Sequence, residues 1–342
     1  MKKLLNTLFV TTQGAYLAKK EETVVVRVEG ETKLRLPIHT IEGIACFGQV
    51  SCSPFLMGLC GQRGVGLSFF TENGRFLARV KGPVTGNVKL RKKQYRYSED
   101  EQLSSLIAQP IVISKIANCR TVLQRGIREE HVPEKARLIE SVKFLDAILG
   151  MLKNPLSLET LRGKEGEAAR SYFSAFSSLI SSQKEDFPFT GRNRRPPLDR
   201  VNAMLSFVYT ILCHDVNNAL EGVGLDPQVG FLHRDRPGRP SLALDLMEEF
   251  RSGIADRLVL SLINRRQVSS EGFSAKESGA VLMQENTRKT ILAAYQKRKQ
   301  VTVIHPFLNE KISFGLIPHV QALLLSRYLR GDIEGYPPYK WR

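Results

Sequence analysis

Residues 24–36 read Val-Val-Val-Arg-Val-Glu-Gly-Glu-Thr-Lys-Leu-Arg-Leu, and this stretch decides how the fold begins. Two runs rich in β-branched and aliphatic residues flank turn material centred on Gly30, which is typical of a β-hairpin. Working outward, the same kind of pattern predicts further strands at residues 4–10, 41–46 and 65–70, a short helix at 53–60, and a hairpin turn at 72–75. The chain therefore starts with a small β-rich unit.

The strand pattern stops after Gly86, and long helical periodicities take its place. They predict helices at 88–108, 110–128, 134–152, 156–180, 198–220 and 280–299. Turn-rich segments separate some of them, at 181–197 and 222–240. The predicted fold class is α+β with two domains: a small N-terminal β-rich domain (1–85), a linker (86–97) and a larger all-α domain (98–342).

The composition points to a polyanionic partner. The 342 residues contain 50 Lys plus Arg against 34 Asp plus Glu, a net charge of +16. Such an excess favours nucleic acid, because basic side chains that neutralise phosphates release condensed counterions. The clusters at 91–93, 192–195, 265–266 and 297–299 are candidate contacts, although each one is also compatible with an ordinary solvated helix face.

The sequence carries no clear export or membrane signal. The 5 cysteines form no Cys-x-x-Cys pair, which favours reduced thiols over a disulfide framework or a zinc ribbon. Residues 1–10 imitate a signal peptide but are interrupted by Asn6 and Thr7, and no small-residue cleavage triplet follows. No apolar run reaches the ~18 residues that a membrane span needs. We therefore expect a soluble, cytoplasmic protein that needs no membrane partner.

Glu165 is the first candidate for chemistry. Steps of three and four residues place it on one helical stripe with Leu158, Leu161, Ala168, Tyr172 and Phe176. A carboxylate on a core-facing stripe must be paired, protonated or bound to a cation, because burying it alone is costly. The pattern leaves two interpretations open: an ion pair with an arginine of another helix, or a metal-binding or catalytic acid.

His233 and a pair of acids form the second candidate. His233 opens a loop with three arginines, Arg234, Arg236 and Arg239, which suits a phosphate-facing surface or simply a hydrogen-bonding histidine. Asp245 and Glu248 then lie three residues apart on one face of a helix that Ser241 can cap, which is compatible with a solvated acidic face. Two carboxylates close to an imidazole also suit Mg²⁺ or Mn²⁺. Together these residues suggest a metal-dependent phosphodiester enzyme, whereas the absence of a Gly-x₄-Gly-Lys-Ser/Thr loop excludes a P-loop NTPase.

Four ordered motifs between Gly163 and Phe250 resemble the universal CRISPR-associated adaptation endonuclease/integrase family. They are the segments Glu-Gly-Glu-Ala-Ala-Arg-Ser-Tyr-Phe (165–173), Arg-Pro-Pro-Leu-Asp-Arg-Val-Asn-Ala-Met-Leu-Ser-Phe-Val-Tyr (195–209), Gly-Leu-Asp-Pro-Gln-Val-Gly-Phe-Leu-His (224–233) and the acidic helix 241–250. The last segment looks closest to the subtype I-C branch.

The resemblance implies a function and a site. Glu165, His233 and Glu248 would bind one divalent metal, Mg²⁺ or Mn²⁺, with Asp245 as an accessory carboxylate and Glu249 as an alternative acid. The larger domain would be catalytic and would join the 3′-hydroxyl ends of foreign DNA fragments into the CRISPR repeat by transesterification. The resemblance further implies a homodimer joined through the β domains, a heterocomplex with the small second CRISPR adaptation protein, and action on double-stranded and branched DNA. Two alternatives remain at this point: a stand-alone metal-dependent nuclease for branched repair intermediates, and a non-catalytic DNA-binding scaffold.

Overall fold

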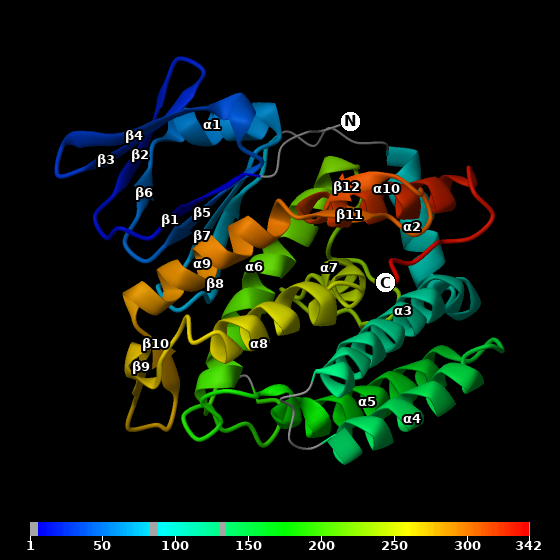
Figure 1. The fold of residues 1–342 in the computed structure, drawn as a ribbon. Coiled ribbons are helices and arrows are strands. Elements are labelled where there is room, and N and C mark those ends of the chain that lie inside the picture. The colour runs from blue at the N-terminus through cyan, green and yellow to red at the C-terminus, as the bar shows by residue number, and fades with distance from the viewer. Residues whose placement is uncertain (1–5, 83–87, 130–134, 194, 342) are drawn as a thin grey trace.

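The computed structural model describes residues 6–82, 88–129, 135–193 and 195–341. Figure 1 shows the strands of the N-terminal part gathered at one end of the molecule, with helices making up most of the remainder. The predicted fold class is confirmed: a small β-rich N-terminal part is followed by a larger helical part.

Two four-stranded sheets form the N-terminal part. One has the order β1 (Thr7–Val10), β5 (Gly43–Phe47), β7 (Gly66–Phe70) and β8 (Phe76–Val80), with β8 antiparallel to β7 and the other pairs parallel. The other has the order β4 (Glu31–Pro37), β3 (Thr23–Val28), β2 (Tyr16–Lys20) and β6 (Ser51–Cys52). The predicted hairpin is the antiparallel pair β3–β4. The predicted short helix is α1 (Pro54–Arg63), which Ser53 caps by accepting a hydrogen bond from the backbone of Leu56 at 3.2 Å.

Strand β5 connects the two parts of the molecule because its side chains alternate between two cores. Ile44 and Cys46 pack into the core between the two sheets, whereas Ala45 and Phe47 belong to the core of the helical part. The ring centroid of Phe47 lies 5.6 Å from that of Phe207 in α6 (Arg200–Gly222). Gly74, in the β7–β8 turn, has φ +83° and approaches the Phe207 ring so closely that a Cβ would clash at 2.6 Å. The β-rich part is thus seated on α6.

The helical part is built around α3 (Glu101–Arg128), which packs against α4 (Lys135–Met151) and α5 (Leu158–Phe176). The other helices are α2 (Val88–Glu99), α7 (Ser241–Met247), α8 (Arg257–Asn264), α9 (Glu285–Lys299) and α10 (Ile317–Arg330), with a π-helical segment, η3 (Arg251–Asp256), between α7 and α8. Short 3₁₀ turns lie at η1 (Ile38–Thr40), η2 (Ser177–Leu179), η4 (Ser270–Gly272) and η5 (Phe314–Leu316). Among the described helices, α3 is long and apolar enough to cross a membrane, but 61% of its most apolar window is buried inside the protein, as for the core helix of a soluble protein.

The helix predicted to begin at residue 88 is confirmed as α2, which covers residues 88–97 of the predicted linker, and residues 86 and 87 lie outside the described residues. The structure corrects two expectations about local structure. The predicted helices 88–108 and 110–128 divide instead at Asp100, whose side chain accepts a hydrogen bond from Leu103 N at 2.9 Å, so that α3 runs through Pro110. Strands also recur after residue 86, in the hairpins β9 (Phe273–Ala275)–β10 (Val281–Met283) and β11 (Thr302–Ile304)–β12 (Lys311–Ser313). Strands of three residues are too short to leave a clear alternation in the sequence.

Candidate active site

Glu165 lies on the buried stripe of α5, as the periodicity predicts. Leu161, Ala168 and Tyr172 of that stripe are 2% exposed or less, whereas the Glu165 side chain is 26% exposed. Its carboxylate is paired, and the partner is a lysine rather than the arginine that one interpretation anticipated. Lys115, from the middle of α3, donates a hydrogen bond to Glu165 Oε1.

Lys115 also contacts the second predicted acid. Its Nζ lies 2.7 Å from Oε2 of Glu248, the residue that follows α7. Arg251 Nη1 donates to the other oxygen of Glu248 at 2.7 Å. The side chains of Lys115 and Glu248 are 9% and 5% exposed. The structure therefore brings Glu165 and Glu248 together around one buried ammonium group.

The charges in this cluster stabilise one another. Burial alone would raise the pKa of Glu248, but Arg251, Lys115 and His233 outweigh it and hold that pKa well below its usual value. Burial alone would likewise lower the pKa of Lys115, but the carboxylates of Glu248 and Glu165 raise it overall. Glu248 is consequently an anion and Lys115 a cation at neutral pH.

Asp245 is fully buried and holds the His233 loop. Its carboxylate accepts hydrogen bonds from the backbone N–H groups of Phe231, Leu232 and His233 at 2.6, 2.9 and 2.9 Å. His233 Nδ1 lies 2.6 Å from Asp245 Oδ1, and because a carboxylate only accepts, Nδ1 is the donor. Gly230 makes this approach possible, since a Cβ there would lie 2.7 Å from Asp245 Oδ2. The interpretation of 245–248 as a solvated acidic face is wrong, because both acids are buried.

Ser241 does not act as the expected cap. It is the first residue of α7, and its hydroxyl donates to the carbonyl of Arg234 at 3.3 Å, which ties the helix to the arginine loop instead. Arg162 of α5 holds the same loop from the other side, with Nε donating to the carbonyl of Leu232 at 2.6 Å. The backbone around His233 is therefore fixed by three residues from two helices, Ser241 and Asp245 of α7 and Arg162 of α5.

The side chains suit a divalent cation in their chemical type. Two carboxylates and one imidazole form a donor set that Mg²⁺ and Mn²⁺ accept. Glu248 Oε2 is buried and accepts no hydrogen bond from any residue that the structure describes, despite its contact with Lys115. Within the same residues, no three His, Cys, Asp or Glu side chains lie close enough to share one ion, because Lys115 stands between the two glutamates. The donor set fits, and Lys115 now supplies the positive charge.

Glu249 points into a different environment from that of Glu248. It accepts hydrogen bonds from the Tyr336 hydroxyl at 2.6 Å, from Tyr339 N at 2.7 Å and from Gln321 Nε2 at 3.0 Å. Burial nevertheless raises the pKa of Glu249 to about 8. Its carboxyl group is enclosed by the end of the chain, so Glu248 is the acid that lies beside Glu165.

Sequence reasoning missed Lys115, Arg251 and the residues that enclose Glu249. Lys115 did leave a signal, because it falls four residues from both Ile111 and Cys119 on the apolar stripe of α3. A lysine on the buried stripe of one helix and a glutamate on that of another can neutralise each other's charge in an ion pair. Arg251 left no comparable signal. Its guanidinium stacks 4.3 Å from the centre of the Tyr209 ring, a contact that only the folded chain creates.

The chain is similar to known proteins in both sequence and fold. The family model for "CRISPR associated protein Cas1" matches residues 8–297. The chain is 53% identical to a CRISPR-associated endonuclease Cas1 of Chlorobaculum tepidum and 48% identical to one of Rhodospirillum rubrum, covering 100% of both chains in each case. Its fold is similar to that of a casposase bound to integration product, with a TM-score of 0.83 at 23% identity over 98% of this chain and 94% of that one.

Proposed function

Because this chain belongs to the Cas1 family of CRISPR-associated proteins, we propose that it is the DNA endonuclease and integrase of CRISPR spacer acquisition. The observation that carries the proposal is the buried cluster of Glu165, Lys115 and Glu248 beside the Asp245–His233 pair. The amino-acid sequence of residues 242–250 supports assignment to subtype I-C. Reduced cysteines support a cytoplasmic location.

Glu165, His233 and Glu248 would hold Mg²⁺ or Mn²⁺. The hydrogen bond to Asp245 keeps the proton of neutral His233 on Nδ1, which leaves the lone pair of Nε2 for a metal. Asp245 therefore orients the ligand, and its two oxygens are already engaged by three backbone N–H groups and the imidazole. When bound, a divalent cation supplies Lewis-acid stabilisation of the charge that develops on a phosphodiester.

The proposed reaction exchanges one phosphodiester for another. The 3′-hydroxyl oxygen of a captured DNA end forms a bond to a phosphorus at the repeat boundary, the bond from that phosphorus to the repeat 3′-oxygen breaks, and the proton passes to the leaving hydroxyl. Bonds formed and broken balance, so no nucleotide energy source is needed. With water as the nucleophile, the same site would cleave DNA, branched DNA included.

The arginine loop supports a DNA substrate beside the site. Arg234 and Arg236 are exposed and follow His233 directly. Guanidinium groups bind phosphates with paired hydrogen bonds. The loop would hold double-stranded DNA close to the site while Asp245 and Arg162 keep its backbone in place. We propose the small second CRISPR adaptation protein as the protein partner.

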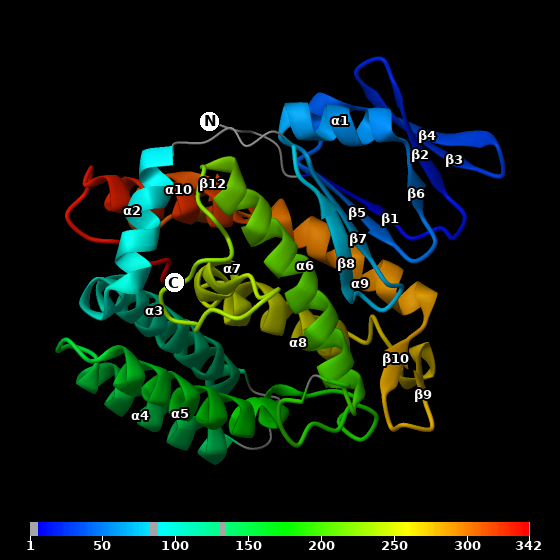
Figure 2. The same cartoon turned by 180° about the vertical axis from the view of Figure 1, so that it is seen from behind.

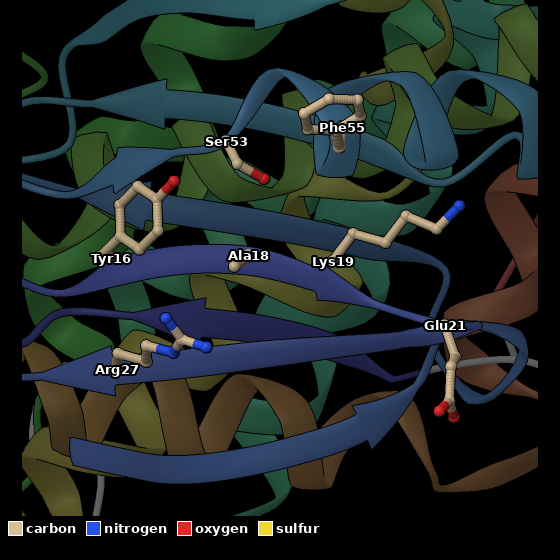
Figure 3. A pocket seen from close by; sticks show the side chains of 7 residues that line it. All are labelled: Tyr16, Ala18, Lys19, Glu21, Arg27, Ser53 and Phe55. Atoms are coloured by element: carbon tan, nitrogen blue, oxygen red, sulfur yellow. The ribbon is translucent and has the colours of Figure 1, made fainter. Parts of the chain in front are cut away.

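A homodimer joined through the β-rich parts is also part of the proposal. Figure 3 shows a shallow depression on β2 and β3, bordered by Tyr16, Arg27 and Phe55. Phe55 of α1 is 81% exposed and Tyr16 of β2 is 40% exposed, so two large aromatic side chains face solvent beside each other. A second copy would cover them. Phe55→Asp should then reduce the mass in solution to that of one chain in sedimentation equilibrium.

A strand-transfer assay tests the proposed function. The purified protein, its small partner, a short duplex with free 3′-hydroxyls and a repeat-bearing plasmid are combined with Mn²⁺ or with a chelator. We expect joined product with Mn²⁺ only, and a loss of at least about 100-fold in Glu165→Gln and His233→Ala, which lack a metal ligand. Glu167→Gln is the matched control, because Glu167 lies two residues away on α5 and pairs with Lys164 instead.

The outcomes separate the alternatives. Cleavage without joining indicates a stand-alone nuclease for branched DNA. DNA binding that is unaffected by chelator and by Glu165→Gln, without cleavage or joining, indicates a scaffold. Product that survives both the chelator and His233→Ala contradicts the metal site.

A further inference from the structure

Two arginines from separate elements lie near each other outside the candidate active site, each beside its own aromatic ring: Arg257 beside Trp341 and Arg298 beside Phe314. The guanidinium of Arg257, the first residue of α8, lies 4.3 Å from the centre of the Trp341 ring. Arg298, near the end of α9, donates from Nη2 to the carbonyl of Gly253 at 2.6 Å. The Trp341 ring lies directly against Gly253. Both arginines therefore border the same small area of surface.

A third arginine reaches this area from α3. The backbone N–H of Trp341 donates to Asn118 Oδ1 at 2.7 Å, which fixes the end of the chain on that helix. Arg125 follows Asn118 by seven residues, two helical turns along the same face. Figures 1 and 2 show helices α8 and α9, which carry Arg257 and Arg298, on the same side of α6.

These positive charges are only partly satisfied by acceptors of the described residues. Arg257 has no hydrogen bond and no carboxylate partner among the residues that the structure describes, and the Nε of Arg298 is buried without a partner there. Arg125 contacts only Glu129, at 3.5 Å, and both side chains are more than half exposed. Burial, followed by repulsion from Arg125 and Arg298, lowers the pKa of Arg257 to about 10, and burial and Arg125 do the same for Arg298. A guanidinium offers five N–H donors, and most of these remain unused.

Stacking on Trp341 explains the position of Arg257 but not its unused donors. A purely structural arginine would be expected to bond to carbonyls or carboxylates as it becomes buried. Arg298 makes one such bond, to the carbonyl of Gly253, whereas Arg257 makes none to the described residues and stacks on a half-buried indole. Arginines beside an accessible aromatic ring are the combination with which proteins hold the backbone and bases of DNA.

We propose that Arg125, Arg257 and Arg298, together with Trp341, form a binding site for the backbone phosphates of DNA, separate from the residues that would hold the metal. The proposal rests on the proposed DNA-processing function and adds to it a second place where the substrate is held. DNA is favoured over an acidic protein segment because guanidinium groups match phosphate oxygens and the net charge of +16 favours a polyanion.

The single tryptophan of the sequence makes the site directly observable. The full chain, kept in chelator so that no metal contributes, is titrated with a short DNA duplex while Trp341 emission and DNA anisotropy are recorded. We expect a saturable change in emission that follows the anisotropy. Arg257→Gln should weaken binding about tenfold and reduce the slope of log affinity against log salt by about one. Arg298→Gln should act in the same direction.

Arg35→Gln is the matched control, because Arg35 lies on β4 and pairs with Glu21. It should keep the affinity of the wild type within about twofold. Melting temperature provides a second readout. Removing one of several unneutralised charges should leave it unchanged or raise it, whereas a structural arginine would lower it.

Several results would overturn the inference. DNA binding without a change in Trp341 emission, or with wild-type affinity in both Arg257→Gln and Arg298→Gln, removes the site while the proposed function stands. A response to poly-glutamate but not to DNA assigns the site to an acidic protein segment. Conversely, a Trp341 response to DNA in a protein that joins no ends under Mn²⁺ keeps the site and contradicts the proposed function.

Discussion

At the scale of single residues, Lys115 decides how two acids can be buried together. Glu165 and Glu248 come from different helices, and without a cation between them their charges would repel in a region of low dielectric. Lys115 satisfies both, and Arg251 adds a second positive charge to Glu248. The cluster is therefore stable without metal, and a metal ion that binds the same oxygens has to share or displace the ammonium group.

We expect Lys115→Met to destabilise the metal-free protein by about 3–5 kcal/mol, because it leaves the buried carboxylate of Glu248 and the partly buried one of Glu165 with one remaining cation. Mn²⁺ should raise the melting temperature of this variant more than that of the wild type, because the ion then replaces the missing charge. Thermal denaturation in chelator and in Mn²⁺ measures both effects.

Lys164→Met is the control for this prediction. Lys164 pairs with Glu167 on the more exposed face of α5, at 2.9 Å, so its loss should change stability by less than about 1 kcal/mol. If Lys115→Met melted like the wild type, and if Mn²⁺ added no more than it does to the wild type, Lys115 would not be the cation that this cluster requires.

At the scale of elements, the segment after α10, residues 331–341, braces the turn that carries Glu248. Asn118 of α3 donates to the carbonyls of Glu249 and Tyr339 at 2.8 and 3.0 Å, and so joins a helix, the turn after α7 and the end of the chain. The Tyr336 hydroxyl closes the arrangement by donating to Glu249 Oε1 at 2.6 Å. Glu248 is held in place because its neighbour is anchored on three sides.

Tyr336→Phe should lower the free energy of unfolding by about 1–3 kcal/mol, because Glu249 loses a donor to a buried oxygen. Strand transfer should fall as well, since the turn that holds Glu248 becomes looser. Chemical denaturation and the joining assay measure the two effects. Tyr328→Phe is the control, because Tyr328 lies half-buried on α10 and its hydroxyl makes no hydrogen bond to the described residues. Equal stability of the two variants would contradict the bracing role.

At the scale of the whole molecule, buried polar groups join the β-rich part to the helices. Lys299 is 3% exposed, pairs with Asp215 at 2.9 Å and donates to Thr7 of β1 at 3.2 Å. The basic run 297–299 is therefore not simply a solvated helix face. His214 of α6 sits at the same junction, with its ring centre 5.8 Å from that of Phe70. Burial first, and then Lys299 and Arg79, lower the pKa of His214 to about 4.

This junction should make stability depend on pH between about 4 and 6.5. The unfolded chain protonates His214 near the ordinary histidine pKa of 6.5 and the folded chain only near about 4, so the unfolded state binds more protons in that window. The contribution of His214 to the free energy of unfolding is complete above about pH 6.5. It is lost as the pH falls from there towards 4, by roughly 3 kcal/mol at pH 4. Melting temperatures recorded across this range test the sign.

His214→Gln should flatten that dependence while keeping an acceptor for Asn218, whose amide lies 3.0 Å from His214 Nε2. His39→Gln, at an exposed position of η1, should keep the wild-type slope. Equal slopes in all three proteins would show that acid sensitivity arises elsewhere.

Strand alternation and helical stripes, which lie within one segment of the chain, predicted the order of most elements and the β-then-α division. The family motifs supplied the three residues proposed as metal ligands. The sequence patterns did not predict the short hairpins after residue 86 or the break at Asp100, because so few residues carry each signal.

The partners of those residues depend on which segments the fold brings together. Lys115 lies 50 residues before Glu165 in the chain, and Asn118 lies 131 residues before Glu249. Trp341 reaches Arg257 only because the end of the chain folds back onto α3. Neutralising a buried charge or satisfying a buried donor depends on which groups meet in space, and a local pattern holds no information about a partner that arrives from the other end of the chain.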